Sequence, residues 1–339
     1  MSQPLCVVVD TSVWRSEVGL RSVAAKTLLY TLSRRHGFLG LPEVVDSELS
    51  HQIAQAAEEE SAKLRSPSNW FQTFFDGGWG CAIPENLRDR VSLAFQKHID
   101  SLAPLLLRDP LTMAQVRSAL SMVNAKVPPN DKHQQFKDSL IWQSVLGLAA
   151  RHELHFVVND AAFFEGKNPK NRLAQNLIDD CARNGVEVNA YGSLRDCLGM
   201  IAEGEPNLNT GLVLSLILPE VVQKLEADST VSNWVLGKLA RQEITGFKTD
   251  EANRVAVDYR LSFKARSHAD GLGRTVHVHG SCYFDPSGPR TLEHHVQNVT
   301  ILWKSGAVTR SFRDYYAGAP IPRPLPFPQQ LPILDPDEE

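Results

Sequence analysis

Two short runs of branched apolar residues stand out in the pattern of hydrophobic and polar positions, and each run ends in an acid. Residues 5–9 are followed by Asp10. Residues 154–158 are followed by Asn159 and Asp160. An unbroken apolar run is typical of a strand covered on both faces, as in a parallel sheet, whereas a half-exposed strand alternates. We therefore predict two buried parallel strands that bring Asp10 and Asp160 to the same edge of a sheet.

Apolar positions at helical spacing, between and after these runs, predict helices that alternate with strands. The predicted helices are residues 17–36, 42–57, 85–102, 110–124, 131–152, 170–184 and 193–202, with further short strands at 38–41 and 186–191. Such alternation is typical of an α/β fold with a parallel central sheet flanked by helices. The aromatic-rich residues 67–82 are interpreted as a connection packed over the core, with a base-stacking platform as the alternative.

The pattern changes near residue 204 and predicts a second, smaller α+β domain with an antiparallel sheet. Its predicted elements are helices at 211–227 and 231–241 and strands at 244–249, 254–265, 274–284, 294–304 and 307–313. Alternation over 255–263 is typical of a half-buried strand, and Asp, Gly, Pro and Ser clusters predict hairpins. The predicted domains are therefore residues 1–204 and 205–318, followed by a proline-rich, acidic and extended tail at 319–339.

The composition of the chain indicates which broad class of protein it belongs to. At 339 residues and 42% hydrophobic, the chain can bury a large core, and its net charge of −4 argues against a broad basic surface but allows a local basic rim. Five cysteines without a CxxC pair predict neither a disulfide framework nor a zinc site. No stretch has the pattern of a signal peptide or a membrane span, so we expect a cytoplasmic protein without a membrane partner.

Two further acids occupy unusual positions on predicted helices. Glu48 falls at the edge of the apolar stripe of one helix, and Asp138 falls at the centre of the apolar arc of another. A carboxylate on a buried face persists when it is paired with a cation, hydrogen-bonded or bound to a metal. A pair with Lys137 or an arginine is the alternative for Asp138, and capping of the following helix is the alternative for Asp10.

Converging carboxylates would suit a divalent cation. Ligand sets made of oxygen alone select magnesium or manganese. Such an ion could activate a water molecule and stabilise the charge that builds on a phosphodiester. The acids thus indicate hydrolytic nuclease chemistry.

Four segments that contain these acids resemble the signature segments of PIN domains, in the same order along the chain. They are residues 7–14, 41–49, 137–142 and 156–163. The resemblance covers about residues 4–200 and implies a parallel sheet with an acidic, Mg²⁺- or Mn²⁺-dependent endonuclease site that acts mostly on RNA. By motif position it implies the acids Asp10, Glu48, Asp138 and Asp160, as catalytic residues and metal ligands, with Ser12 and Asn159 as polar neighbours.

The resemblance leaves two details of the site open. Glu43 and Asp46 lie in the same segment as Glu48 and are alternatives to it. Ala162 stands where some PIN domains carry a further acid, which implies a thinner metal shell and favours a single ion. The resemblance says nothing about residues 206–318.

Basic and histidine side chains add candidate binding residues. Lys132, Lys137 and Lys167 could hold phosphates near the acids, with solubility as the alternative for each. His277 and His279 share one face of a predicted strand, and His294 and His295 lie on the next. A zinc site across these strands is one interpretation, but without an obvious fourth ligand we favour a polar sheet face that docks a protein partner, a second copy or substrate.

The leading hypothesis is a metal-dependent endoribonuclease that cleaves single-stranded RNA, with a toxin or defence effector as its expected role. The first alternative is a catalytically weak RNA-binding or scaffolding subunit that uses the C-terminal sheet. The second alternative is a structure-specific DNA nuclease.

Overall fold

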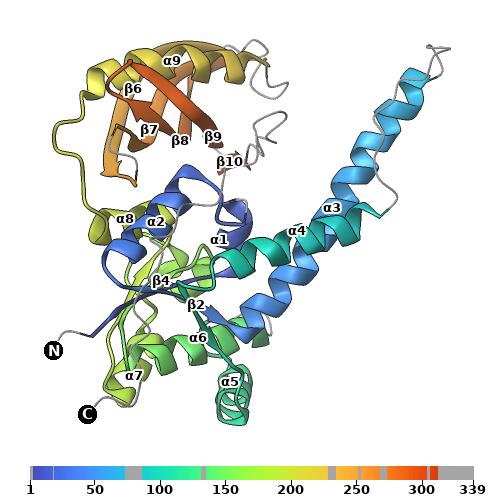
Figure 1. The fold of residues 1–339 in the computed structure, drawn as a ribbon, viewed down its shortest axis with the longest axis vertical. Helices are drawn as coiled ribbons and strands as arrows, with labels where there is room; N and C mark the ends of the chain where they lie inside the picture. The colour runs from blue at the N-terminus through green and yellow to red at the C-terminus, as the bar shows by residue number, and fades with distance from the viewer. Residues whose placement is uncertain are drawn as a thin grey trace.

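The computed structural model describes residues 3–17, 19–72, 86–130, 135–227, 234–250, 253–267, 273–303 and 306–311. Within these residues the chain forms one parallel and one antiparallel sheet, each of five strands (Figure 1). Helices flank the parallel sheet, and the antiparallel sheet belongs to the C-terminal part of the chain. The predicted fold class is therefore confirmed.

The parallel sheet has the strand order β3-β2-β1-β4-β5. Its strands are β1 (Leu5–Val9), β2 (Phe38–Pro42), β3 (Leu106–Asp109), β4 (Glu153–Val157) and β5 (Val188–Tyr191). β1 and β4 pair in parallel along their whole length, with Val9 opposite Val157. The chain builds outward from β1 on one side and then from β4 on the other, so the connections change direction between these two strands. In open parallel sheets, ligands bind beyond the carboxyl ends of the strands at such a point.

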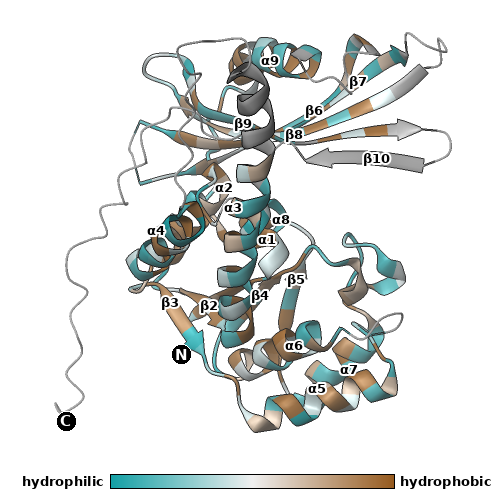
Figure 2. Cartoon of the chain, turned by 90° about the vertical axis from the view of Figure 1, so that its right-hand side faces the viewer, coloured by the Kyte–Doolittle hydropathy of each residue, from teal (hydrophilic) through white to brown (hydrophobic). Residues whose placement is uncertain are grey.

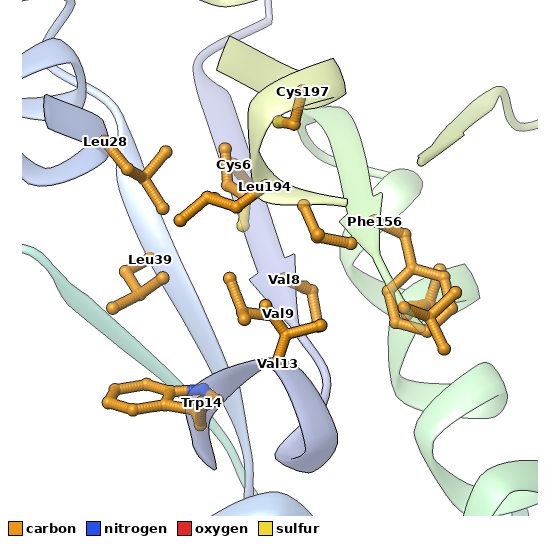
Figure 3. Close-up of a cluster of buried hydrophobic side chains, with 14 of the residues drawn as sticks. Cys6, Val8, Val9, Val13, Trp14, Leu28, Leu39, Phe156, Leu194 and Cys197 are labelled. Carbon is orange, nitrogen blue, oxygen red and sulfur yellow. The ribbon is translucent and has the colours of Figure 1, made fainter. Parts of the chain in front are cut away.

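Helices on both faces keep this sheet away from water. The helices are α1 (Thr11–Ser16), α2 (Val23–Arg34), α3 (Glu43–Gln72), α4 (Leu87–Ser101), α5 (Met113–Ala125), α6 (Phe136–Ala149), α7 (Gln175–Asn184) and α8 (Leu194–Ile201), with the short 3-10 helices η1 (Ala161–Phe163) and η2 (Glu165–Lys167). α2 and α8 lie on one side of the sheet and α6 on the other (Figure 2). Figure 3 shows Cys6, Val8 and Leu39 of the strands packed with Leu28 and Leu194 of these helices.

The antiparallel sheet has its own apolar core. Its strands, in the order β10-β9-β8-β7-β6, are β6 (Trp234–Lys248), β7 (Val255–Ser267), β8 (Gly273–Asp285), β9 (Arg290–Trp303) and β10 (Gly306–Ser311). Helix α9 (Thr210–Ala227) covers one face with Val213, Ile217, Val221 and Leu225, which are spaced by four residues and share one side of the helix. The domain limits near residues 204 and 318 stay predictions.

Helices α1, α2 and α8 lie between the two sheets (Figures 1 and 2). The face of the antiparallel sheet opposite α9 contacts them at one end, where Phe247, Ala256 and Tyr283 join the core of the parallel part. Charged pairs accompany this apolar contact, among them Lys26 of α2 with Glu293 of β9 at 2.6 Å. The antiparallel sheet is therefore packed against the helices that cover the parallel sheet.

The predicted helix at 231–241 is wrong, because the described residues from Trp234 onward form β6. The sequence misleads here because Leu236 and Leu239 are three residues apart, a helical spacing. In the structure both leucines pack on the core of the antiparallel sheet, since the register with β7 shifts between them. An irregularity of this kind places residues three apart on one face of a strand.

Other element boundaries also differ from the sequence predictions. The helix expected from residue 17 begins at Val23, because Gly19 and Leu20 have positive φ and Ser22 caps α2 by accepting from Ala25 N at 3.0 Å. The edge strand β3 was not predicted, because only four apolar and charged residues form it. α3 extends to Gln72 and α6 starts at Phe136.

Some predictions fall where the structure gives no description. Most of the aromatic-rich segment at 67–82, Lys132, and the tail at 319–339 lie outside the described residues. Among the helices that are described, none combines the length and apolar character needed to cross a membrane.

Candidate functional site

Asp10 lies at the carboxyl end of β1 and is the N-cap of α1. Its backbone N donates to Val157 O of β4 at 2.9 Å, which fixes it at the junction of the two central strands. Asp10 Oδ2 accepts from Ser12 N at 3.0 Å and from Ser12 Oγ at 2.5 Å, and the residue is only 7% exposed. Asp10 therefore caps helix α1, which was the alternative interpretation of this residue. The same hydrogen bonds orient its carboxylate at the edge of the sheet.

Glu48 lies on α3 and points toward the end of β1. Its Oε2 accepts from Thr11 Oγ1 at 3.0 Å. Its Oε1 accepts from Lys137 Nζ at 3.1 Å and from Gln52 Nε2 at 2.8 Å. These bonds tie α3 to α1 and α6, and they place Glu48 beside Asp10.

Glu43 and Asp46, the alternatives in the same segment, point elsewhere. Glu43 Oε2 accepts from Leu111 N at 2.8 Å, and Asp46 pairs with Arg108 of β3. Residues two and five positions away from Glu48 project from a helix in clearly different directions. Of the three acids, the structure brings Glu48 to the end of β1.

Asp138 lies in the first turn of α6, a helix buried on most sides. It is half-buried and has no hydrogen-bond partner among the residues that the structure describes. Lys137, which the sequence suggested as its ion pair, contacts Glu48 instead. Asp138 is therefore a carboxylate on a mostly buried helix without a direct cation partner in the described part of the chain.

Asp160 follows β4 and caps η1. Its Oδ1 accepts from Ala162 N at 2.8 Å, and its Oδ2 accepts from Gln135 Nε2 at 3.1 Å. Gln135 precedes α6 and is itself held by Asn130, whose Oδ1 accepts from Gln135 N at 2.8 Å. A chain of polar contacts thus connects the end of β4 with the start of the helix that carries Asp138.

The four acids act on one another electrostatically. The pKa of Asp138 is raised to about 7, first by burial and then by the negative charges of Asp10, Asp160 and Glu48. Burial is also the main cause of the raised pKa of Asp10, to which the charge of Glu48 contributes. Carboxylates that repel one another in this way favour the protonated form or a bound cation.

The candidate donor atoms are of the type that Mg²⁺ and Mn²⁺ prefer, but they are not close enough to one another to bind one ion. All candidate donors are carboxylate oxygens, the type that these ions prefer. Within the described residues, however, no three acidic, histidine or cysteine side chains are close enough to hold an ion as they stand. Electrostatic repulsion acts over longer distances than coordination, so both findings hold together. Side-chain rotation of the acids would be needed to share one ion.

The polar and basic candidates differ in how they relate to the acids. Ser12 holds Asp10, whereas Asn159 is exposed beside Asp160. Lys137 is 63% exposed and reaches Glu48. Lys167 ends η2, in the segment that follows Asp160.

Sequence reasoning missed Thr11, Gln52 and Gln135, which bind the acids directly. Thr11 was next to a singled-out acid, but its partner is 37 residues away in the sequence. Gln52 lies one helical turn after Glu48, a spacing that could have indicated the contact. Nothing in the sequence distinguishes Gln135 from other polar residues near a helix start.

Three histidines of the antiparallel sheet contact other side chains of the same chain. His279 Nε2 contacts Asp258 Oδ2 at 2.8 Å, and His277 Nδ1 contacts Ser262 Oγ at 2.7 Å. His294 contacts Glu220 through one ring nitrogen and Tyr259 Oη through the other. The described residues give no cluster suited to zinc. His277 and His279 lie on the face away from α9, whereas His294 lies on the face that α9 covers, and docking of a partner stays a prediction.

Comparison of the sequence with protein-family models and with curated proteins finds no match in either case. The resemblance to PIN domains therefore rests on the four short segments.

Proposed function

We propose that this protein is a metal-dependent endonuclease that hydrolyses RNA phosphodiester bonds at the site formed by Asp10, Glu48, Asp138 and Asp160. The observation that carries the proposal is the gathering of four mutually repelling carboxylates where the strand connections change direction. A group of like charges that one exposed lysine offsets only in part is costly for folding, which makes a functional role the better explanation. The choice of RNA rests on the resemblance to PIN domains.

The chain's own residues have distinct tasks in this proposal. Asp10, Asp138 and Asp160 would hold Mg²⁺ or Mn²⁺, and Glu48 would complete the set. When bound, the ion would activate water and stabilise charge on the phosphodiester. The bonds from Ser12, Thr11 and Gln135 orient the carboxylates before substrate arrives.

Lys137 is the exposed cation beside Glu48, and its task in this proposal is to contact the substrate. Its ammonium group offsets part of the negative charge and is free on its outer side to contact a phosphate.

A cytoplasmic location and a role as a toxin or defence effector belong to the same proposal. Buried free thiols, such as Cys6 and Cys197, suit a reducing compartment.

Cleavage of a labelled single-stranded RNA by the full chain tests the proposal. We expect cleavage with Mn²⁺ or Mg²⁺, none with excess chelator, and its loss in Asp10→Asn and Asp138→Asn variants that keep the wild-type circular dichroism spectrum. Full activity in chelator or in both variants would refute it. A matched single-stranded DNA run in parallel assigns the substrate, because cleavage of DNA alone would overturn the RNA assignment.

A second candidate function is an RNA-binding subunit without catalysis. The observation in its favour is that no three acids in the described residues stand ready to share an ion. It predicts RNA binding without turnover and no rise in melting temperature on addition of Mn²⁺. A divalent-ion-dependent rise that disappears in Asp138→Asn would exclude it.

A further inference from the structure

The face of the antiparallel sheet that points away from α9 changes from buried to exposed along each strand. β7 shows this most clearly, because its alternate residues on this face run from the contact with α2 toward open solvent. Along this face Ala256 and Asp258 are buried, Arg260 and Ser262 are half-buried, and Lys264 and Arg266 are exposed. One end of the face is therefore an internal interface, and the other end is open surface.

The open end is basic. Ser262 lies opposite Arg241 of β6 and opposite His277 of β8, so these side chains share the face with its neighbours on β7. We name this surface the basic face, and it consists of Arg241, Arg260, Lys264, Arg266 and His277. Arg241 is 75% exposed.

Acids offset only part of this charge. Glu243 pairs with Arg241 at 2.7 Å, and Asp196 of α8 lies 3.7 Å from Arg260. Lys264 and Arg266 have no acidic partner within the described residues. Because the whole chain carries a net charge of −4, a surplus of cations here is local and runs against the average charge. Such a patch attracts a polyanion.

A short hairpin-like segment next to the acid site carries a further cation. This segment starts after Asp160 and is closed by the bridge between Phe164 and Leu173. The exposed Lys170 lies within it, and burial, followed by the charges of Lys170 and Arg241, lowers the pKa of His277. Cations therefore stand both on the segment that follows the fourth acid and on the antiparallel sheet.

The chemistry of the face indicates contact with a backbone and not with bases. Among its residues, the half-buried His277 carries the one aromatic ring, so the described part of the face lacks stacking platforms for successive bases. Alternate residues of a strand are about 7 Å apart, so Lys264 and Arg266 are separated by about 7 Å and Arg260 and Lys264 by about 14 Å along the strand. Rows of cations contact phosphates and carry no sequence information.

We infer that the basic face binds the sugar-phosphate backbone of single-stranded RNA, without base preference, and guides it toward the acid site. The choice of RNA rests on the function proposed above, whereas the choice of a polyanion rests on the charge of the face. The antiparallel sheet is then the substrate-binding part of the protein and the parallel sheet carries the cleavage site.

Binding of a labelled single-stranded RNA to the full chain in chelator, followed by fluorescence anisotropy, tests this inference without cleavage. The Lys264→Glu/Arg266→Glu variant is expected to bind about tenfold more weakly or worse at low salt, since each cation contributes a phosphate contact. In Lys264→Ala and Arg266→Ala the slope of log affinity against log salt is expected to fall by about 0.7 for each lost contact.

The matched control is Lys97→Glu/Arg117→Glu, which makes the same change of charge on exposed residues of α4 and α5. It is expected to bind like the wild type. Equal weakening in both double variants, or none in either, would overturn the inference. Displacement of the RNA by polyglutamate at equal charge concentration would overturn the assignment to RNA and indicate an acidic protein partner.

Failure of the inference and failure of the proposed function give different results. If the wild type cleaves RNA while the basic-face variant binds it normally, the nuclease proposal stands and the inference fails. If the wild type binds RNA through the basic face but never cleaves it, the inference stands and the nuclease proposal fails.

Discussion

At the carboxyl edge of the parallel sheet the charges of three other carboxylates act on Asp138, whereas on the antiparallel sheet Asp258 contacts Arg195 and His279. The negative charges around Asp138 raise its pKa, and Lys137 opposes them only in part. Asp258 is 3% exposed, with Arg195 Nε at 2.9 Å and His279 Nε2 at 2.8 Å. Two poorly accessible acids in one molecule thus have opposite surroundings.

The difference separates a structural acid from a candidate functional one. A buried charge that has its counter-charge in the protein serves folding and packing, and here it joins α8 to the antiparallel sheet. A group of like charges without one lowers stability and persists when a ligand supplies the missing charge.

The largest expected effect is on cleavage, where Glu48 and Asp46 can be compared on one helix. Glu48→Gln is expected to lower kcat by roughly two to three orders of magnitude, since several kcal/mol of transition-state stabilisation correspond to that factor. Asp46→Asn removes an acid that pairs with Arg108 and should change kcat by less than about threefold. Single-turnover cleavage of RNA measures both. A larger loss in Asp46→Asn would reverse the assignment.

Loss of the structural acid should have the largest effect on stability. Asp258→Asn leaves the buried Arg195 with the more distant, half-exposed Glu243 at 3.9 Å as its acidic partner among the described residues, and we expect a loss of about 3 to 5 kcal/mol in the free energy of unfolding. Urea denaturation measures the loss. Glu243→Gln, at a half-exposed position nearby, is the control and should cost less than about 1 kcal/mol. Similar small losses in both variants would show that Asp258 is not a structural charge.

Loss of the candidate functional acid, Asp138, should instead raise the stability of the protein. The raised pKa of Asp138 means that the folded protein keeps a proton that the unfolded chain releases near pH 4, so wild-type stability falls as the pH rises from about 4 to about 7. In chelator at pH 8, Asp138→Asn should be more stable by roughly 1 to 4 kcal/mol, given about 1.4 kcal/mol for each tenfold change in proton affinity. Thermal melts at pH 4 and pH 8 measure this, and a less stable variant at pH 8 would contradict it.

The smallest effect is expected at the ion pair between the sheets. Lys26→Met keeps most of the side chain but removes the contact with Glu293, so we expect a loss of about 1 kcal/mol. Arg88→Met breaks the exposed pair with Glu58 and should cost almost nothing. Chemical denaturation compares the two. Equal effects would mean that the Lys26 pair is as solvent-screened as a surface pair.

Much of the site could be predicted because its signals are local. Asp10 and Asp160 follow unbroken apolar runs, and Asp138 interrupts the apolar arc of a helix. Glu48 could not be distinguished from Glu43 and Asp46, since its direction depends on how α3 packs against α1 and α6. Gln135 could not be predicted, because its partner Asp160 is 25 residues away.

The sequence by itself determined the two kinds of sheet and the strand ends that carry the acids, because hydrophobic period and turn residues act over a few neighbouring positions. The tertiary structure decided that residues 234–241 belong to a strand and not to a helix, because pairing with β7 outweighs local helical spacing. It also decided which charges are neutralised. Asp258 meets Arg195 and Asp138 meets other acids only after distant segments pack together, and no local pattern records those distances.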